Sequence, residues 1–234
     1  MSPFVAELTG TAVLITLGSG VVANVLLDKT KGNNSGLMVI ALAWAVAVFV
    51  GVYISADISG AHLNPAVTIG LAVAGKFSWN EVPSYLLAQL LGAFIGAVLA
   101  WLTYKDHFSA TKDPSLLLAV FSTGPAIRKP FSNLLTETIA TFIFMLSIFY
   151  IQKGEVKLGA LDALPVSLLV LGIGLSMGGP TGYAINPARD LGPRIAHAIL
   201  PIPNKGGSDW QYAPIPVVGP VLGAVLAAIL YNFL

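Results

Sequence analysis

Two short polar boxes in an apolar chain carry the side chains best able to act on a small solute. Each box reads Asn-Pro-Ala, and the six residues are Asn64, Pro65, Ala66, Asn186, Pro187 and Ala188. Asparagine is a favoured helix N-cap and proline suits the first helical turn, so each box predicts the start of a helix. The side-chain oxygen of a capping asparagine accepts a hydrogen bond from a backbone N–H group of the helix. Its amide NH2 can still donate a hydrogen bond to water or a hydroxyl, so capping and solute binding are compatible.

The surroundings of the two boxes repeat along the chain. Gly60 and Gly70 flank the first box at the spacings at which Gly182 and Gly192 flank the second. A second repeat contains small residues that let helix backbones approach closely, and its glycines are Gly92, Gly96, Gly219 and Gly223. One box alone would favour simple helix capping. Two boxes in matching surroundings favour a shared function in an internally duplicated chain.

The elements that must position these boxes are membrane helices. Six apolar segments have the ~20-residue length that a spanning helix needs, and they are Phe4–Leu27, Leu37–Ala56, Val82–Thr103, Asn133–Ile151, Leu161–Met177 and Tyr212–Leu234. The stretches Pro65–Ala74 and Pro187–Leu200 are too short to span and predict half-helices that start inside the membrane. Each half holds three spans, so the second half must enter from the opposite side. The sequence predicts an all-α membrane protein with six transmembrane helices and two re-entrant half-helices in an inverted repeat.

The domain organisation follows from this repeat. We expect one transmembrane domain over residues 1–234, with a first repeat over about 1–103 and a second over about 131–234. The segment Tyr104–Pro130 would be an extramembrane loop that joins the two repeats. Broken helices at such a repeat interface are where membrane proteins place solute sites.

Composition supports lipid as the solvent of this chain and excludes several functions. Hydrophobic residues make up 56% of the sequence and charged residues only 10%, against about a quarter in soluble proteins. A net charge of +1 offers no basic field for nucleic acid. There is no cysteine, which excludes disulfides and cysteine-bound metals, and we expect no metal and no cofactor. Membrane lipid is the one partner that composition alone predicts.

The two boxes in an inverted repeat resemble the aquaporin family, and within it the aquaglyceroporin or glycerol-facilitator branch. The resemblance implies a bundle of six spans and two half-helices, a homotetramer with one pore in each protomer, and a cell-membrane location with both termini in the cytoplasm. Each half-helix would point about half a positive charge at the midplane, which opposes cations and protons but not neutral solutes. Amide donors that point one way would also interrupt a proton wire.

The loops before the boxes have no helical periodicity, and irregular backbone at membrane depth lines a cavity or is buried in protein. The resemblance implies that their carbonyls line the pore, at Gly60, Ala61, His62, Gly182 and Ala184. For His62 a functional role and a packed, satisfied histidine are left open. The resemblance also gives Glu7 and Glu137 a scaffolding role, as acceptors for backbone N–H groups of these loops, in preference to a proton relay.

The resemblance places the narrowest point of the pore at four residues near the outer mouth, which are Trp44, Gly174, Tyr183 and Arg189. The arginine offers a planar fork of donors to hydroxyls and repels cations, with an ion pair to Asp190 as the lesser alternative. Trp44 and Tyr183 would form an apolar corner for a carbon chain, and Gly174 would leave room. Water-selective members have histidine and phenylalanine where this chain has Gly174 and Trp44.

The filter predicts a passive channel for small uncharged solutes such as glycerol and dihydroxyacetone, with some water flux. Tyr183 replaces the phenylalanine typical of bacterial glycerol facilitators, and its hydroxyl suggests neutral hydroxy acids such as protonated lactic acid as further solutes. The rivals are an orthodox water channel and a coupled secondary transporter, for which Asp57 is the candidate acid. An enzyme is disfavoured because no nucleophile–base pair or metal cluster is evident.

The membrane orientation that the distribution of basic residues favours conflicts with the orientation that the family resemblance implies. Cytoplasmic termini would leave most basic residues outside, and these are Lys29, Lys31, Lys105, Lys112, Arg128, Lys129 and Lys205. Only Lys76, Lys153 and Lys157 would lie inside, whereas the positive-inside rule favours the reverse.

Overall fold

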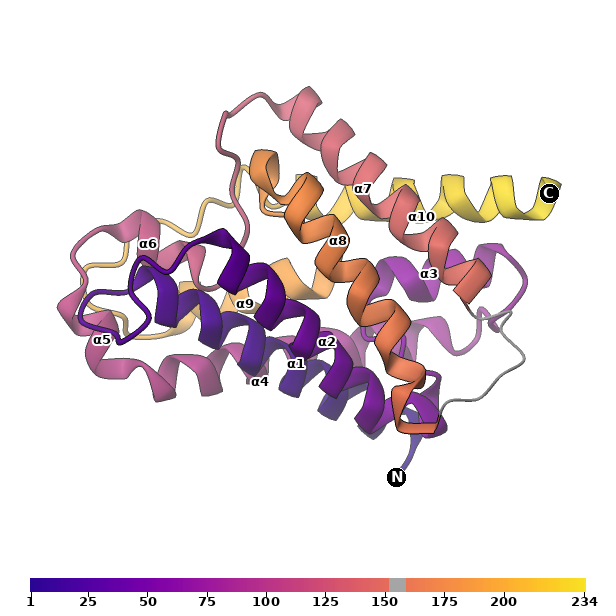
Figure 1. Ribbon diagram of the computed structural model, residues 1–234, viewed down its shortest axis with the longest axis horizontal. Coiled ribbons are helices and arrows are strands. Elements are labelled where there is room, and N and C mark those ends of the chain that lie inside the picture. Colours follow the sequence, from indigo (N-terminus) through magenta and orange to yellow (C-terminus); the bar gives the residue numbers. More distant parts are fainter. Residues whose placement is uncertain (152–158) are drawn as a thin grey trace.

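The computed structural model describes residues 1–151 and 159–234, and the predicted architecture of six spans and two half-helices is confirmed. The spanning helices are α1 (Pro3–Leu26), α2 (Leu37–Ser59), α4 (Val82–Thr103), α7 (Pro130–Ile151), α8 (Leu164–Thr181) and α10 (Ile215–Phe233). The half-helices are α3 (Pro65–Val73) and α9 (Pro187–Ile199). Figure 1 shows α3 and α9 in the interior of the bundle, approaching one another from its two ends. Lys153 and Lys157, expected on the inner side, lie outside the described residues.

The predicted boundaries shift where proline and glycine decide them. Helix α7 starts at Pro130, earlier than the predicted Asn133, because proline is favoured in a first helical turn. A 3-10 turn, η1 (Gly159–Ala163), comes before α8, which starts at Leu164 with Pro165 in its first turn. At its other end α8 runs beyond the predicted Met177 until Gly182, whose φ of +81° suits glycine as a C-cap.

The two halves pack around matching glycine contacts. In the first half, a Cβ on Gly96 of α4 would lie 2.5 Å from the backbone oxygen of Ala12 on α1. In the second half, a Cβ on Gly223 of α10 would lie 2.3 Å from the backbone oxygen of Thr138 on α7. Both distances are far below van der Waals contact, so these helix pairs cross as closely as they do only because the positions carry glycine. The glycine repeat seen in the sequence thus joins the first and third spans of each half.

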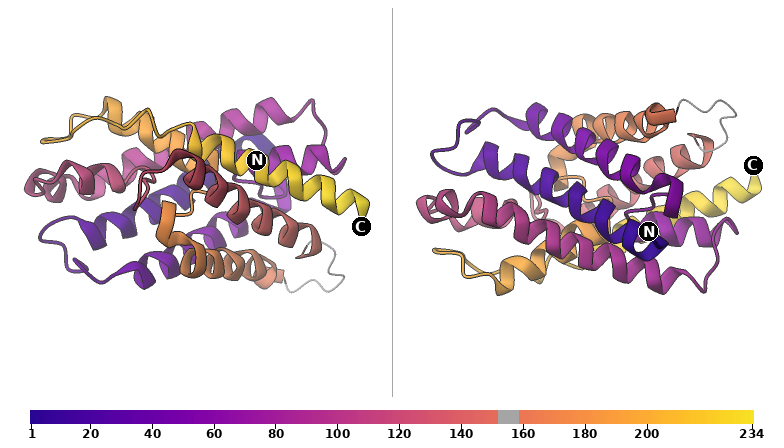
Figure 2. Two further views of the ribbon diagram at one scale, coloured as in Figure 1. Left: turned by 90° about the horizontal axis from the view of Figure 1, so that it is seen from above. Right: turned by 90° about the horizontal axis from the view of Figure 1, so that it is seen from below.

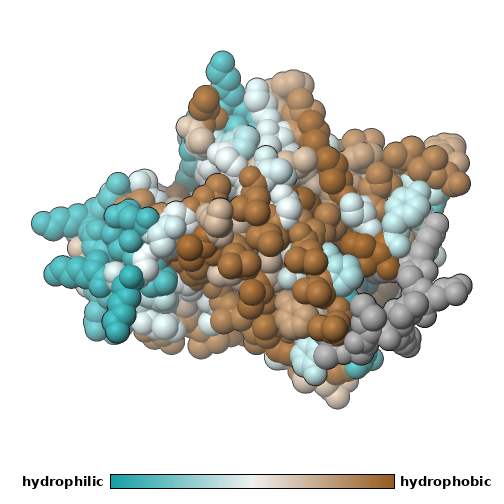
Figure 3. Space-filling model, in the orientation of Figure 1, coloured by the Kyte–Doolittle hydropathy of each residue, from teal (hydrophilic) through white to brown (hydrophobic). Residues whose placement is uncertain are grey.

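The outer surface is apolar along the spans. Met38, Leu42 and Val46 on α2 and Leu168 on α8 are among its exposed side chains. Figure 3 shows hydrophobic atoms over the centre of one face and hydrophilic atoms gathered at the end of the bundle that carries α5 in Figure 1. The two termini lie toward the same end of the bundle (Figure 2), as an even number of spans requires.

The connection between the halves is more structured than a plain loop. It contains α5 (Lys105–Ala110) and α6 (Pro114–Ala119), and Asp113 caps α6 by accepting a hydrogen bond from the backbone N–H of Ser115 at 2.8 Å. Beyond α6 the chain turns inward, and Phe121 and Thr123 are buried against the second half-helix and its loop. This segment therefore reaches the region of the predicted filter.

Candidate functional site

The two Asn-Pro-Ala boxes meet and hold one another. Each asparagine caps its own half-helix: the Oδ1 of Asn64 accepts from Ala66 N at 2.9 Å, and the Oδ1 of Asn186 accepts from Ala188 N at 3.0 Å. Each Nδ2 then crosses to the opposite loop, from Asn64 to the oxygen of Ile185 at 2.8 Å and from Asn186 to the oxygen of Leu63 at 2.9 Å. An amide NH2 carries two hydrogens, so these crossed bonds use one hydrogen of each asparagine.

The loops before the boxes share an unusual backbone. Ala61 and Leu63 have φ of +51°, and their counterparts Tyr183 and Ile185 have φ of +38° and +44°. The left-handed region costs a side-chain-bearing residue about 1–2 kcal/mol, so four such residues need strong support from their surroundings. Strain at the same positions in both halves shows that the duplication extends to backbone conformation.

Two buried glutamates accept hydrogen bonds from these loops. Glu7 on α1 accepts hydrogen bonds from the backbone N–H groups of His62 at 2.9 Å and Leu63 at 2.7 Å. Glu137 on α7 accepts from the backbone N–H groups of Ala184 and Ile185, each at 3.0 Å. The two carboxylates therefore contact equivalent backbone groups of the two loops.

Hydroxyl and amide groups complete these contacts. The Ser59 hydroxyl donates to Glu7 at 2.7 Å, and the Thr181 hydroxyl donates to Glu137 at 2.6 Å. The first half adds Gln89, whose Nε2 donates to Glu7 at 2.8 Å. A buried charged group is tolerated only when it has such hydrogen-bond partners. The donors that converge on each glutamate are those that a buried carboxylate group requires.

A cavity of about 460 Å³ runs past the boxes and has a mixed lining. Its polar groups include His62, Asn64, Asn186 and Arg189, and Asp162 of η1 also lines it. Its apolar lining comes largely from α2, α7 and α8, with side chains that include Val48, Val52, Phe144, Ile148, Val166 and Val170. A solute inside this cavity therefore meets both hydrogen-bonding groups and hydrocarbon.

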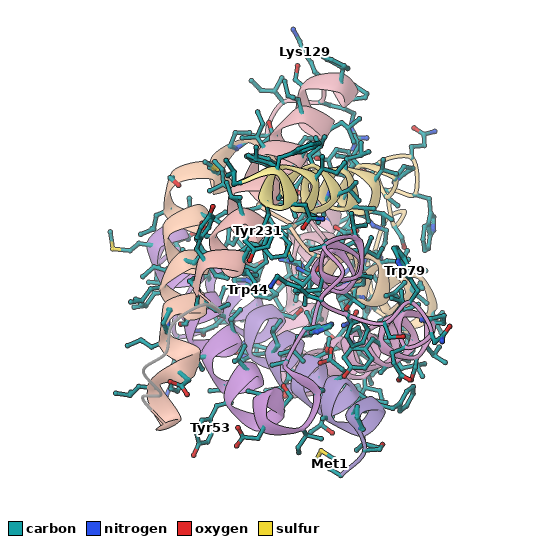
Figure 4. The ribbon with its side chains drawn as sticks, turned by 90° about the vertical axis from the view of Figure 1, so that its right-hand side faces the viewer. Met1, Trp44, Tyr53, Trp79, Lys129 and Tyr231 are labelled. Carbon is teal, nitrogen blue, oxygen red and sulfur yellow. The ribbon has the colours of Figure 1, made fainter. Side chains whose placement is uncertain are left out.

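Arg189 and Trp44 meet in the lining of this cavity. The guanidinium carbon of Arg189 lies 4.3 Å from the centre of the Trp44 ring, and its Nη1 donates to the backbone oxygen of Phe121 at 3.4 Å. Trp44 lies inside the bundle in Figure 4, whereas Tyr53 on the same helix points outward. Tyr183 also lines the cavity, and its buried hydroxyl has no hydrogen-bond partner among the described residues.

The lesser alternative for Arg189, an ion pair with Asp190, does not match the structure. Asp190 instead pairs with Arg194, at 2.8 Å from Nε to Oδ1, and both side chains are fully buried. Arg194 also donates to the backbone oxygens of Ser208 and Thr123, at 2.8 and 3.0 Å. This network ties the second half-helix to the segments that contain Thr123 and Ser208, and Arg189 lies beside Trp44 instead.

Two predicted site residues lie one layer back from the cavity. Gly174 lies behind the Tyr183 ring, where a Cβ would be 3.0 Å from the tyrosine Cζ. Gly182 lies against Thr123, at 3.3 Å from the position of its Cβ to the threonine Cγ2. Neither residue is among those that line the cavity, whereas Gly60, Ala61, His62 and Ala184 are.

His62 is both packed and part of the cavity wall. Its Nδ1 lies 3.1 Å from the Thr68 hydroxyl, and its ring packs against the rings of Phe77 and Tyr85 with centroids 4.6 and 4.9 Å away. The two interpretations that the sequence left open are therefore compatible in space.

The sequence did not predict the apolar lining that α2 contributes beyond Trp44, although a signal for it existed. Trp44, Val48 and Val52 recur every fourth residue on α2 and share one helix face. Extending that face from Trp44 would have identified both valines. Phe121 had no comparable signal, because its role depends on how the connection between the halves folds back.

Six spans, two opposed half-helices and a cavity between them define an inverted-repeat membrane channel. Comparison with known proteins gives the family. A family model for the major intrinsic protein matches residues 1–231. The chain belongs to this family, whose members are passive channels rather than enzymes, and it is a multi-pass membrane protein of the glycerol-facilitator branch.

Several relatives are similar over the whole chain. A probable glycerol uptake facilitator protein of Thermotoga maritima is 56% identical over 100% of both chains, and a glycerol uptake facilitator protein of Streptococcus pneumoniae is 53% identical over 99% of both. The aquaglyceroporin of Plasmodium falciparum is similar in structure, with a TM-score of 0.87 and 35% identity over 98% of this chain and 94% of that one.

Proposed function

We propose that the protein is a passive channel for small uncharged polyols, with glycerol as its main solute. The observation that carries this proposal is the contact between the Arg189 guanidinium and the Trp44 ring in the lining of the cavity. A polyol has hydroxyls along one side and carbon along the other, so it can satisfy the arginine fork and contact the ring at once. The names of the relatives support the choice of glycerol.

The remaining site residues have supporting roles in this proposal. The Asn64 and Asn186 amides donate to the solute at the point where the half-helix dipoles oppose ions. The loop carbonyls at Gly60, Ala61 and Ala184 replace water as acceptors. Glu7 and Glu137 hold those loops, and the hydrogen bonds described above support that role.

Stopped-flow light scattering on proteoliposomes tests the proposal. We expect rapid glycerol and dihydroxyacetone entry and some water flux, with no leak of ions or protons. An orthodox water channel would give fast water flux with glycerol entry no faster than in empty liposomes. Gly174 favours the polyol channel, because a histidine at this position would displace the Tyr183 ring that lies against it.

The Tyr183 hydroxyl extends the proposal to small hydroxy acids in their neutral form, such as lactic acid. This hydroxyl is buried without a partner among the described residues and has almost no surface open to a solute, so a solute hydroxyl or carboxyl group would satisfy it once the Tyr183 ring turns toward the cavity. Lactic acid entry should rise as the pH falls, because the neutral fraction of the acid rises. Tyr183→Phe removes the hydroxyl and keeps the ring. Unchanged relative rates for glycerol and lactic acid in this variant would reject the role of the hydroxyl.

A coupled secondary transporter is the second alternative. Its candidate coupling acid, Asp57, is exposed near the end of α2 and does not line the cavity, which favours passive flow. We also propose a homotetramer in the lipid of the cell membrane with both termini in the cytoplasm. Cross-linking in liposomes tests the tetramer, and labelling of single cysteines introduced near the termini of this cysteine-free chain tests the orientation.

A further inference from the structure

Each aromatic ring of the proposed filter rests on a glycine that does not line the cavity. The Trp44 ring lies against Gly18 of α1, where an added Cβ would be 2.4 Å from both Cη2 and Cζ3 of the indole. The Tyr183 ring lies against Gly178 of α8, where an added Cβ would be 2.6 Å from Cδ1. Carbon atoms prefer separations of about 3.5–4.0 Å, so neither ring could keep its position beside a methyl group.

Neighbouring glycines show that these contacts are particular to the two positions. Gly20 on α1 and Gly172 on α8 have no atom within 4 Å of an added Cβ, and neither precedes a proline. Alanine at either of them would meet no neighbour, and a helix interior tolerates alanine better than glycine. Each helix therefore contains a glycine that lies against the ring and another glycine that does not.

A displaced ring has little choice of direction. Trp44 is only 4% exposed and Tyr183 only 7%, and both line the cavity. Protein interiors are close-packed, so the cavity is the space into which a ring pushed off its glycine can move. The required shift is on the order of 1 Å, the difference between the contact available and the contact that carbon prefers. Tyr183 is held by Gly174 as well, one helical turn from Gly178.

We propose that Gly18 and Gly178 are positioning residues that set the width of the solute pathway by fixing how far Trp44 and Tyr183 reach into it. This inference rests on the proposed polyol function and adds two specificity-determining positions outside the cavity lining. Water needs less width than glycerol. Alanine at either position should therefore lower glycerol permeability much more than water permeability.

The test compares Gly18→Ala and Gly178→Ala with the matched controls Gly20→Ala and Gly172→Ala in proteoliposomes. Glycerol and water permeabilities are measured per folded channel, with thermal unfolding in detergent to quantify folded protein. We expect glycerol permeability to fall about tenfold or more in the two test variants, as overpacking of a tight contact implies, and water permeability to change by less than about threefold. The two control variants should have the glycerol and water permeabilities of the wild type.

A double variant separates ring displacement from general damage. Trp44→Phe removes the part of the indole that an alanine at position 18 would meet. Adding Trp44→Phe to Gly18→Ala should therefore restore glycerol flux toward the level of Trp44→Phe alone. If either test variant folds and keeps the wild-type ratio of glycerol to water permeability, or if both fluxes fall in proportion without rescue, the inference is wrong. A wild type without glycerol flux would instead reject the proposed function itself and this inference with it.

Discussion

Glu137→Gln tests the support of the strained second loop. The carboxylate accepts hydrogen bonds from the Thr181 hydroxyl and from the backbone N–H groups of Ala184 and Ile185. A glutamine keeps one oxygen, which can serve Thr181 and Ala184, but its NH2 then faces the Ile185 N–H. One charge-assisted bond is lost and a buried donor is left unpaired, which together should lower the free energy of unfolding by about 2–4 kcal/mol.

Thermal unfolding of the purified protein measures this change. A loss of 2–4 kcal/mol in a chain of this size lowers the midpoint by roughly 5–15 °C. Glycerol permeability should fall as well, because Tyr183 and Ala184 of the same loop line the cavity. Glu81→Gln is the control, since Glu81 is exposed at the start of α4. An unchanged midpoint and unchanged glycerol flux in Glu137→Gln would refute the scaffolding role.

Further substitutions probe other parts of the structure. Gly223→Ala places a Cβ 2.3 Å from a backbone oxygen of α7 and should lower stability by about 1–3 kcal/mol in thermal unfolding, whereas Gly172→Ala, with nothing within 4 Å, should not. Arg194→Leu leaves Asp190 buried without its ion pair and should lower stability by about 3–5 kcal/mol, so a normal midpoint would contradict the network. Asn186→Asp adds one negative charge where two half-helices together supply about one positive charge, and should produce a cation or proton leak measured with a pH-sensitive dye. An ion-tight Asn186→Asp variant would reject the dipole barrier.

The spans and half-helices were predictable because their signals are local. Apolar length distinguishes a spanning segment such as Val82–Thr103, whose bounds the structure reproduces, from a half-helix such as α3. The predicted helix boundary was wrong where a turn precedes the helix. The prediction for α8 included Leu161, which belongs to the 3-10 turn. Residues such as Glu7 could be predicted from the sequence, because a lone acid in an apolar span needs a buried partner.

The contacts between the halves were not predictable from local patterns. The hydrogen bond from Asn64 to the Ile185 oxygen joins two loops that are adjacent only after both repeats have folded. The approach of Phe121 to Arg189 depends likewise on the path of the connection between the halves. Nothing in the sequence distinguishes Gly18 from other small residues of a helix. Only the position of the Trp44 ring shows that this glycine makes room for the indole. Sequence patterns thus identify the elements, whereas tertiary packing determines which side chains line the cavity.

The initial rate of labelled glycerol entry into proteoliposomes, measured against external glycerol concentration with and without imposed proton and sodium gradients, tests the proposed function most directly. A passive channel predicts a rate that rises linearly with concentration, exceeds that of empty liposomes and does not respond to either gradient. A rate that saturates at low concentration and increases with an inward proton or sodium gradient would contradict the account and favour a coupled transporter.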